Sequence, residues 1–349
     1  MRFLSLIVLA ALGACTAADV QPTEPREEVT AAPTWSLAEQ ASALRAQSCP
    51  EGVSFRRADA ISIRVIEAER GTADVRELNL SGISLAGAWH LESERGFGGL
   101  SGLDVMRSGS LLAIADNGKF VWISIDPETG MPDGIGSMAY MHDGDGNVWS
   151  NKLAADAEGL SFRDGLAFVS FERDHRVEAY DLEGCGAAAH AALVGRLDTV
   201  VDGKVLGDNR GPEALALHDD QLSLGFETHA SGGSPIGEMR EDGTLNNLRR
   251  TEQPALYLLT GMDASDGLTA KIFRAYDPAQ GPRGLVQVES EDRLIATAKL
   301  KKPLPVDNYE GIAIGQAPSG QTRIWLISDD NFSNNQRTLL LALDLDPAS

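Results

Sequence analysis

Glutamates recur at matching places along this chain, each beside a short apolar run. Glu158 stands in DAEGLSF, Glu213 in GPEALAL and Glu310 in NYEGIAIG. After Glu158 and Glu213, a second carboxylate follows 14 positions on, at Glu172 and Glu227, behind the next apolar run. Carboxylates gathered in one place raise each other's pKa and attract cations. The pattern therefore indicates a metal site or acid–base chemistry.

Two further copies of the pattern are imperfect. GGLSGLDV has Ser101 in the place of the glutamate, and Asp116 follows the next run. We call the glutamate at the first apolar run the entry residue and the carboxylate behind the next run the exit residue. In the last copy the exit carboxylates, Asp329 and Asp330, come after a longer loop. We assign the catalytic role to Glu158, Glu213, Glu310 and Asp329. The metal-ligating set that we expect is Asp116, Glu158, Glu172, Glu213, Glu227, Glu310, Asp329 and Asp330.

Strands must position these side chains. Residues 308–345 contain three apolar runs, NYEGIAIG, IWLISDDNF and RTLLLALDL, separated by polar loops, and they predict three antiparallel strands. Because neighbouring strands of a hairpin run in opposite directions, the start of one and the end of the next lie at the same sheet edge. The entry and exit carboxylates are therefore expected at one end of each sheet.

The repeat period predicts the fold. Glu158 follows Ser101 by 57 positions, Glu213 follows Glu158 by 55, and the 97 positions from Glu213 to Glu310 leave room for two units. One of them, around ALYLLTGMDASDGLTAKIFRAYDP, has no entry glutamate. Units of this length are typical of four-stranded blades that close into a ring. We predict an all-β fold over residues 49–349, a β-propeller with six blades preferred and five possible.

The first residues resemble a targeting signal. An apolar run from Phe3 to Leu12 follows Arg2, and it is shorter than the roughly 20 residues that a membrane helix needs. LGAC, ending at Cys15, resembles a bacterial lipobox. We expect residues 1–14 to be a lipoprotein signal peptide and Cys15 to be lipidated, with an ordinary secretory signal as the alternative. Thr16 favours anchoring in the outer membrane, facing the periplasm.

Residues 15–48 are expected to form the lipidated tether and a short helix. The tether is rich in Ala, Thr, Pro and Glu and has few large apolar side chains. Ser36 and Glu39 match a capping box, and the helix from there to Arg45 has few core residues, so we expect it on the outside of the domain.

The remaining cysteines and the charge limit the chemistry further. Besides Cys15 the chain has only Cys49 and Cys185, which favours one disulfide in an oxidising compartment; two separate thiols are the alternative. The net charge is -21, from 30 basic and 51 acidic residues, and it argues against a nucleic-acid or anionic-membrane surface. We expect a monomer that contacts the membrane only through its lipid.

Several basic side chains stand near the exit carboxylates in the sequence. They can neutralise the carboxylates or clamp an anionic group. We assign a substrate-binding role to four of them, Arg173, His175, Arg210 and Arg337. The alternative explanation for any single carboxylate is that it caps a turn or binds backbone amides at a blade entry.

At these residues the chain resembles the phytase-like β-propeller family, named for a proposed esterase-like activity of phytases. The motifs that carry the resemblance are GGLSGLDV with LLAIADNG, DAEGLSF with VSFERDHRVEAYDL, GPEALAL, and NYEGIAIG with LISDDNFSNNQRTLLLALDL, between Gly87 and Leu345. The resemblance implies an envelope propeller with a carboxylate-lined channel that hydrolyses phosphate or other esters. Ser101 and the unit around Met262 depart from the pattern and leave the number of metal ions open.

Three functions fit these observations. The first is a hydrolase of phosphate or other esters that depends on a divalent metal, with calcium favoured because it accepts about 6–8 oxygen ligands in flexible geometry. The second is a lactonase-type enzyme with one divalent ion at the channel mouth. The third is a non-catalytic propeller that binds a ligand or an envelope partner. The substrate in the first two is a small anionic ester or a lactone.

Overall fold

The protein is described by a computed structural model, which covers residues 31–69, 80–93, 96–149, 151–198, 200–201, 203–207, 210–227 and 232–347. Residues 32–349 form one compact unit. The predicted signal peptide, Cys15 and nearly all of the tether lie outside the described residues. Among the residues that are described, no helix has the length and apolar character needed to cross a membrane.

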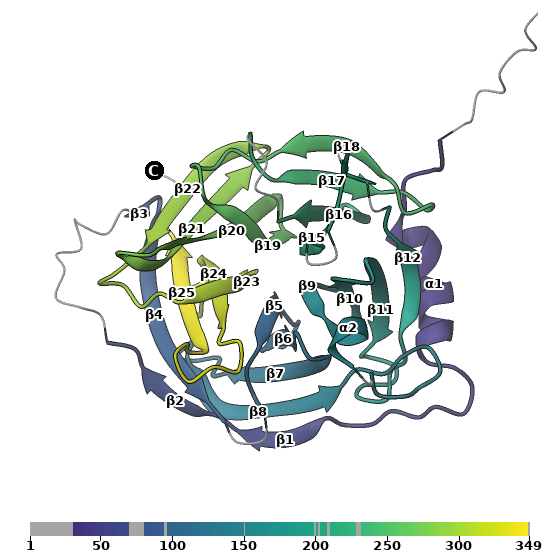
Figure 1. Ribbon diagram of the computed structural model, residues 1–349. Coiled ribbons are helices and arrows are strands. Elements are labelled where there is room, and N and C mark those ends of the chain that lie inside the picture. Colours follow the sequence, from purple (N-terminus) through teal and green to yellow (C-terminus); the bar gives the residue numbers. More distant parts are fainter. Residues whose placement is uncertain are drawn as a thin grey trace, which may run out of the picture. The chain divides into compact units, whose positions relative to one another are not determined.

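Five antiparallel sheets are arranged in a ring around a common axis (Figure 1). Each sheet is one blade. From the axis to the rim, the strands named below for each blade follow one another in chain order. Blade 1 contains β5 (Leu100–Val105), β6 (Leu111–Ala115), β7 (Lys119–Ile125) and β8 (Pro132–Tyr140), and blade 2 contains β9 (Ala157–Arg163), β10 (Leu166–Phe171), β11 (Arg176–Asp181) and β12 (Ala192–Arg196). Blade 3 contains β15 (Pro212–His218), β16 (Gln221–Phe226), β17 (Pro235–Met239) and β18 (Leu245–Arg250). Blade 4 contains β19 (Leu258–Ser265), β20 (Leu268–Asp277), β21 (Gly281–Ser290) and β22 (Arg293–Leu300), and blade 5 contains β23 (Asn308–Gln316), β24 (Thr322–Asp329) and β25 (Leu339–Leu345).

The strands before blade 1 complete other blades and do not form one of their own. In blade 5, β25 pairs with β4 (Ile83–Glu92), which pairs with β2 (Arg64–Glu67), so the two ends of the propeller are joined in one sheet. β1 (Asp59–Ser62) extends blade 1 and β3 (Leu80–Ser81) extends blade 4. The predicted β-propeller is confirmed, with five blades, the lower of the two counts, and not the preferred six. Outside the blades, β13 (Val200–Val201) and β14 (Lys204–Val205) form a small hairpin.

The predicted short helix is present as α1 (Leu37–Ser48), and it packs on the outer strands of blade 2 (Figure 1). It ends three residues after the expected Arg45, and Leu44 anchors it in the core between blades 2 and 3. Directly after the helix, Cys49 forms a disulfide with Cys185, with 5.7 Å between the two Cα atoms. The disulfide ties the end of the helix to the turn that follows β11.

The hydrophobic core consists of five clusters, each between two neighbouring blades. Phe168 of blade 2 and Leu215 of blade 3 belong to one cluster, and Ile114 of blade 1 and Leu160 of blade 2 belong to another. Because both faces of a blade are covered by its neighbours, some inner strands are buried along their whole length, as in β6 and β10. This explains why their sequences are continuous apolar runs without clean alternation.

Hydrogen bonds from side chains to backbone amides connect the innermost strands around the ring. Asp104 on β5 accepts a hydrogen bond from a backbone amide of β9. Ser161 on β9 accepts one from an amide of β15 at 3.1 Å, and Asp263 on β19 accepts one from an amide of β23 at 2.7 Å. Each bond crosses from one blade to the next. The innermost strands are therefore held at defined positions relative to one another, which is what a site built from several blades requires.

Candidate functional site

A β-bulge occurs at the same place in all five innermost strands. In β5, β9, β15, β19 and β23 the register with the second strand shifts just after the strand begins, and one residue is left out of the pairing. A bulge bends the strand and changes where a side chain points, and bulges are common next to active sites. The five residues at the bulges are Ser101, Glu158, Glu213, Thr260 and Glu310.

A glycine follows four of the five bulged residues, and close packing explains it. A Cβ atom on Gly261 would stand 2.1 Å from the carbonyl oxygen of Glu310 on the next blade. A Cβ on Gly311 would stand 2.9 Å from the Leu103 side chain. The small residue lets neighbouring innermost strands approach closely, and this brings the bulged side chains of adjacent blades toward one another.

The second strand of each blade contributes one more residue at the same end of the sheet. In four blades this exit position carries an acid, and in blade 4 it carries Arg274, which pairs with Leu258. Thr260 and Arg274 are 14 positions apart, the spacing that separates Glu158 from Glu172. The sequence therefore contained a signal for Arg274 as the fifth exit residue, and our reading of the repeats missed it. The exit residues are Asp116, Glu172, Glu227, Arg274 and Asp329.

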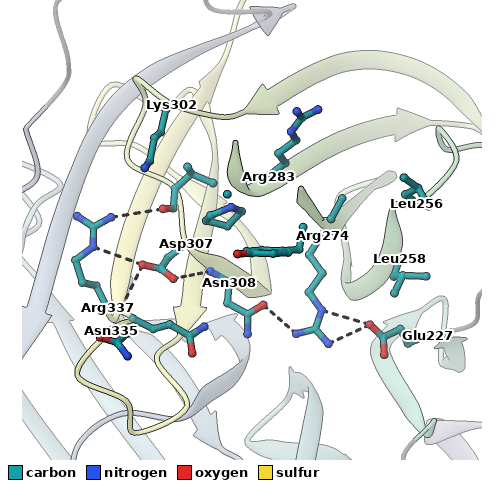
Figure 2. Close-up of a pocket in the computed structure, with 16 residues that line it drawn as sticks. Glu227, Leu256, Leu258, Arg274, Arg283, Lys302, Asp307, Asn308, Asn335 and Arg337 are labelled. Carbon is teal, nitrogen blue, oxygen red and sulfur yellow. Dashed lines mark hydrogen bonds and ion pairs between the residues drawn. The ribbon is translucent and has the colours of Figure 1, made fainter. Parts of the chain in front are cut away.

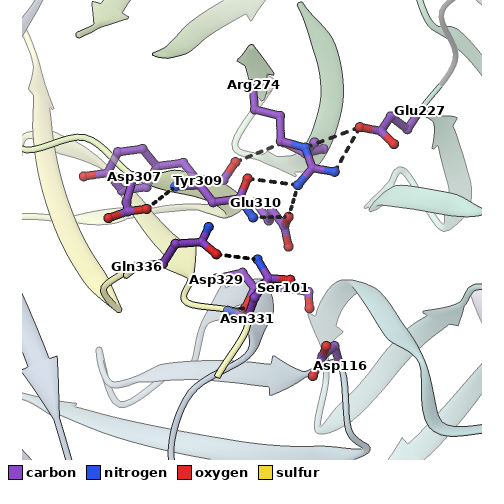
Figure 3. Close-up of polar contacts among 12 residues, drawn as sticks. Ser101, Asp116, Glu227, Arg274, Asp307, Tyr309, Glu310, Asp329, Asn331 and Gln336 are labelled. Atoms are coloured by element: carbon purple, nitrogen blue, oxygen red, sulfur yellow. Dashed lines mark hydrogen bonds and ion pairs between the residues drawn. The ribbon is translucent and has the colours of Figure 1, made fainter. Parts of the chain in front are cut away.

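Arg274 of blade 4 links acids from the two blades on either side of it, blades 3 and 5 (Figure 3). Its Nη2 atom lies 3.0 Å from Oε1 of Glu227, and its Nη1 atom forms an ion pair with Oε1 of Glu310. Nη1 also donates to Oδ1 of Asn308 at 2.9 Å, and Nδ2 of Asn308 donates to Oε1 of Glu310 at 2.8 Å. We call Glu213, Glu227, Arg274 and Glu310 the arginine half of the site.

Burial is the largest influence on the pKa values of Glu213 and Glu310 in this half. It raises the pKa of Glu310 to about 8, although Arg274 acts in the opposite direction. Burial, followed by the charge of Glu227, also raises the pKa of Glu213 well above its ordinary value. Glu213 is 7% exposed, and no hydrogen bond or ion pair joins its carboxylate to the part of the chain that the structure describes. One arginine therefore compensates two of the three acids directly.

In the other half of the site, the described cations pair with aspartates, and none of them pairs with Glu158 or Glu172. One oxygen atom from each of Asp156, Glu158 and Glu172 can be chosen so that all three lie within 4.8 Å of one another. Asp156 stands directly before β9, two residues before the bulge. It was not among the predicted ligands, although it is the first acid of the DAEG motif. We call Asp116, Asp156, Glu158 and Glu172 the acidic half.

The carboxylates of the acidic half differ in their partners. Oδ2 of Asp156 accepts a hydrogen bond from Nε of Arg173 at 2.5 Å, and Oε1 of Glu172 accepts one from the amide of Gly211 at 3.0 Å. Arg173 has a φ of 61°, a left-handed conformation that is rare for residues other than glycine and is often found at functional sites. Among the described residues nothing donates to the carboxylate of Glu158. Burial and then the charge of Glu310 raise its pKa well above the ordinary value.

Asp116 joins the acidic half through Lys152, which lies on α2 (Lys152–Ala155). Nζ of Lys152 lies 2.5 Å from Oδ2 of Asp116 and 3.6 Å from Oδ1 of Asp156. Oδ1 of Asp116 is buried and has no hydrogen-bond partner in the described part of the chain. A buried carboxylate oxygen without a donor is costly unless a cation or a proton compensates it. Burial accordingly raises the pKa of Asp116.

The two exit acids of blade 5 have different environments. Asp329 is 4% exposed, and burial raises its pKa to about 6. Oδ1 of Asp330 accepts hydrogen bonds from the amides of Gly99 and Phe332, both at 2.9 Å, and its Oδ2 accepts one from the Thr338 hydroxyl at 2.9 Å. Asp330 thus ties the loop after β24 to the loop before β5, and we leave it out of the proposed metal ligands.

Of the four predicted substrate-binding residues, Arg173 contacts the acidic half, through Asp156. His175 is 7% exposed, which leaves little of its side chain accessible to a ligand. Arg210 is exposed in the loop before β15, next to the glycine whose amide binds Glu172. Arg337 lies 3.5 Å from Asp307, and the two side chains face each other in the close-up of the pocket (Figure 2).

Arg337 lines a cavity of about 780 Å³ formed by residues of blades 4 and 5 (Figure 2). The cavity shares Glu227 and Arg274 with the arginine half, and Asn308, which binds Glu310, is also part of its wall. It therefore adjoins the arginine half directly.

A family model described as "Phytase-like: Esterase-like activity of phytase" matches residues 95–235 and 240–332. No curated protein matches the chain. Among similar solved structures, a protein of unknown function from Dyadobacter fermentans is 11% identical, covers 84% of this chain and 97% of its own, and has a TM-score of 0.41. An endo-arabinase from Bacteroides thetaiotaomicron is 9% identical, with coverage of 73% and 96% and a TM-score of 0.44. The calcium structure of a Trichoderma reesei family AA12 enzyme is 9% identical, with coverage of 85% and 100% and a TM-score of 0.40.

Proposed function

This chain belongs to the phytase-like family, and on that premise we propose that it is a metal-dependent hydrolase of phosphate or other esters whose reaction takes place at the acidic half. The observation that carries the proposal is the convergence of Asp156, Glu158 and Glu172 within 4.8 Å. Three carboxylates this close are stable only with a cation or with bound protons.

The acidic half fits a hard divalent cation, and we propose calcium. All of the candidate ligands are carboxylate oxygens, the donors that calcium prefers. Glu158 has no partner among the described residues, and Oδ1 of Asp116 is buried without a donor, so unused ligand atoms are present. Asp156, Glu158 and Glu172 would hold the ion. When bound, such an ion neutralises the charge of an ester substrate and lowers the pKa of water.

Glu310 is suited to act as the general acid. Its Oε1 atom accepts hydrogen bonds from Arg274 and Asn308, which leaves Oε2 to carry a proton. With a pKa raised to about 8, the carboxyl group is mostly protonated at neutral pH and can donate that proton to a leaving group. The charge of Glu310 affects the pKa of Glu158, so the two carboxyl groups are within electrostatic reach.

A lactonase-type enzyme with one divalent ion is the second candidate, and Arg274 favours it. The guanidinium occupies the place between Glu227 and Glu310 that a second cation would need. A single ion, held by the acidic half, is therefore the simplest arrangement. Both candidates use the same carboxylates and differ in the substrate, an anionic ester or a lactone.

The cellular location is also part of the proposal. The lipobox-like sequence before Cys15 supports anchoring by lipid in the outer membrane, with the propeller in the periplasm as a monomer. The disulfide between Cys49 and Cys185 fits an oxidising compartment of this kind.

Metal analysis and an ester panel test the function together. We expect the purified protein to bind about one calcium ion and to hydrolyse 4-nitrophenyl phosphate, 4-nitrophenyl acetate or a γ-lactone, with activity lost after chelation. Glu158→Gln should weaken calcium binding about tenfold or more, whereas Glu128→Gln, at an exposed turn, should not change it. Turnover of the lactone alone would select the second candidate. A protein that binds no divalent ion and hydrolyses none of these compounds would contradict both.

A further inference from the structure

Cationic side chains outnumber carboxylates in the lining of the cavity of blades 4 and 5, although the protein as a whole is strongly acidic. Four cationic side chains line it and two carboxylates do, whereas the chain carries a net charge of -21. The cations are Arg274, Arg283, Lys302 and Arg337, and the carboxylates are Glu227 and Asp307. Arg283 and Arg274 pair with carboxylates that do not line the cavity, so the cations left to attract an anion are Lys302 and Arg337.

Two of these cations, Arg337 and Lys302, are incompletely neutralised. Nε of Arg337 lies 3.5 Å from Asp307, at the outer limit of a hydrogen bond. Arg283 does not add to them, because its Nη2 pairs with Asp277 at 3.0 Å and its Nε is buried. Lys302 is exposed, and its ammonium group makes no ion pair within the described chain. The cavity therefore offers donors that a bound anion can use.

Large apolar side chains stand beside these cations. Tyr276 is 71% exposed and Leu256 is 81% exposed, and both line the cavity. Exposed side chains of this size next to charged groups are typical of ligand sites, which combine an apolar wall with a few polar anchors. The combination fits an organic anion with an apolar body better than a bare inorganic ion.

We propose that this cavity binds the anionic part of the substrate, a phosphate or carboxylate group attached to an aromatic or alkyl body. Lys302 and Arg337 contact the anion, and Tyr276 and Leu256 contact the body. The cavity shares Arg274 with the arginine half, so a ligand bound there lies next to the network that holds Glu310. That the ligand is the substrate rests on the proposed function; that the cavity binds such an anion does not.

The test measures binding of 1-naphthyl phosphate, with 1-naphthoate as the carboxylate and 1-naphthol as the uncharged analogue. Titration calorimetry in the Glu158→Gln background separates binding from turnover. Lys302→Glu should weaken binding of 1-naphthyl phosphate about fivefold or more. Lys301→Glu makes the same charge change one residue away, at an exposed position outside the cavity, and should weaken it by about twofold or less. At least one of the two anions should bind more tightly than 1-naphthol.

Two results would overturn the inference: equal effects of Lys302→Glu and Lys301→Glu, or binding of 1-naphthol as tight as that of both anions. Absence of measurable binding of either anion would overturn it as well. The proposed function is separable from it. Ester hydrolysis whose KM is unchanged in Lys302→Glu would preserve the function and remove this substrate site. Binding that depends on Lys302 in a protein that hydrolyses no ester would preserve the anion site and remove the function.

Discussion

Both halves of the central site are built on β-bulges of the innermost strands, but their acidic side chains meet different partners. In the arginine half, Arg274 bridges Glu227 and Glu310, so the protein supplies its own cation. In the acidic half, Lys152 contacts both Asp116 and Asp156, Arg173 contacts Asp156, and Glu158 has no partner among the described residues. The arginine half therefore holds a cation between its acids, whereas in the acidic half Glu158 is left to a proton or to the ion that we propose.

The difference shows how a repeated fold produces an asymmetric site. Each blade has a bulge and an exit residue at the same end of the sheet, so the backbone offers five equivalent positions. Replacing the acid pair by Thr260 and Arg274 in one blade changes the charge balance on that side only. The chemistry is then set by which side chains occupy equivalent positions, not by the backbone that presents them.

Removing the internal cation should have the largest effect. Arg274→Ala leaves Glu227 and Glu310 buried beside Glu213 without compensation, and we expect the free energy of unfolding in a chelator to fall by about 3–5 kcal/mol. Calcium should restore part of this loss and bind at about two ions per chain, because the arginine half then resembles the acidic half. Urea unfolding with and without calcium, together with metal analysis, measures both quantities.

Two further variants control this experiment. Arg274→Lys keeps the charge but loses the planar fork, so its effect should be smaller than that of Arg274→Ala. Arg249→Ala removes an exposed arginine from the outer strand of blade 3 and should change stability little. If Arg274→Ala were as stable as Arg249→Ala, the arginine half would not depend on its cation and the comparison between the halves would fail.

The pH dependence of stability should distinguish the two halves, and the expected effect is of intermediate size. The pKa of Glu310 is about 8 in the folded protein and 4.5 as an ordinary value, so between these limits the folded state binds more protons than the unfolded state. The contribution of this group to stability without metal should therefore be greatest at low pH and should be lost as the pH rises from about 4.5 to 8. Glu310→Gln should reduce the slope in chemical denaturation across this range.

Calcium provides the second arm of this experiment. Burial also raises the pKa of Glu158, so its proton contributes to the same fall in stability, but there an ion can replace the proton. Calcium should flatten the remaining pH dependence of Glu310→Gln and leave more of it in Glu158→Gln. An equal response of the two variants to calcium would mean that the ion does not distinguish the halves.

The smallest effect is expected at Asp330. Because its two oxygens already accept three hydrogen bonds, Asp330→Asn should leave calcium binding unchanged and lower the free energy of unfolding by about 1 kcal/mol. Thermal unfolding and calorimetric titration with calcium are sufficient measurements. Loss of calcium binding in this variant would extend the acidic half into blade 5.

Much of this architecture is readable in the sequence because it depends on local patterns. Short apolar runs between turn residues predict antiparallel strands, and their order places Glu158, Glu213 and Glu310 at one end of successive sheets. The repeat length predicts blades and ring closure. The spacing from Thr260 to Arg274 follows the same pattern, but neither residue is acidic, so a pattern of carboxylates does not include them.

Only the tertiary structure decided the blade count and the distribution of partners. The N-terminal strand β4 pairs with β25 instead of starting a sixth blade, a contact between distant parts of the chain that no local pattern specifies. Which acids meet a cation depends on how neighbouring blades pack, as with Arg274 between Glu227 and Glu310. Spacing along a strand determines the end of the sheet at which a side chain lies, and packing between sheets determines what it touches.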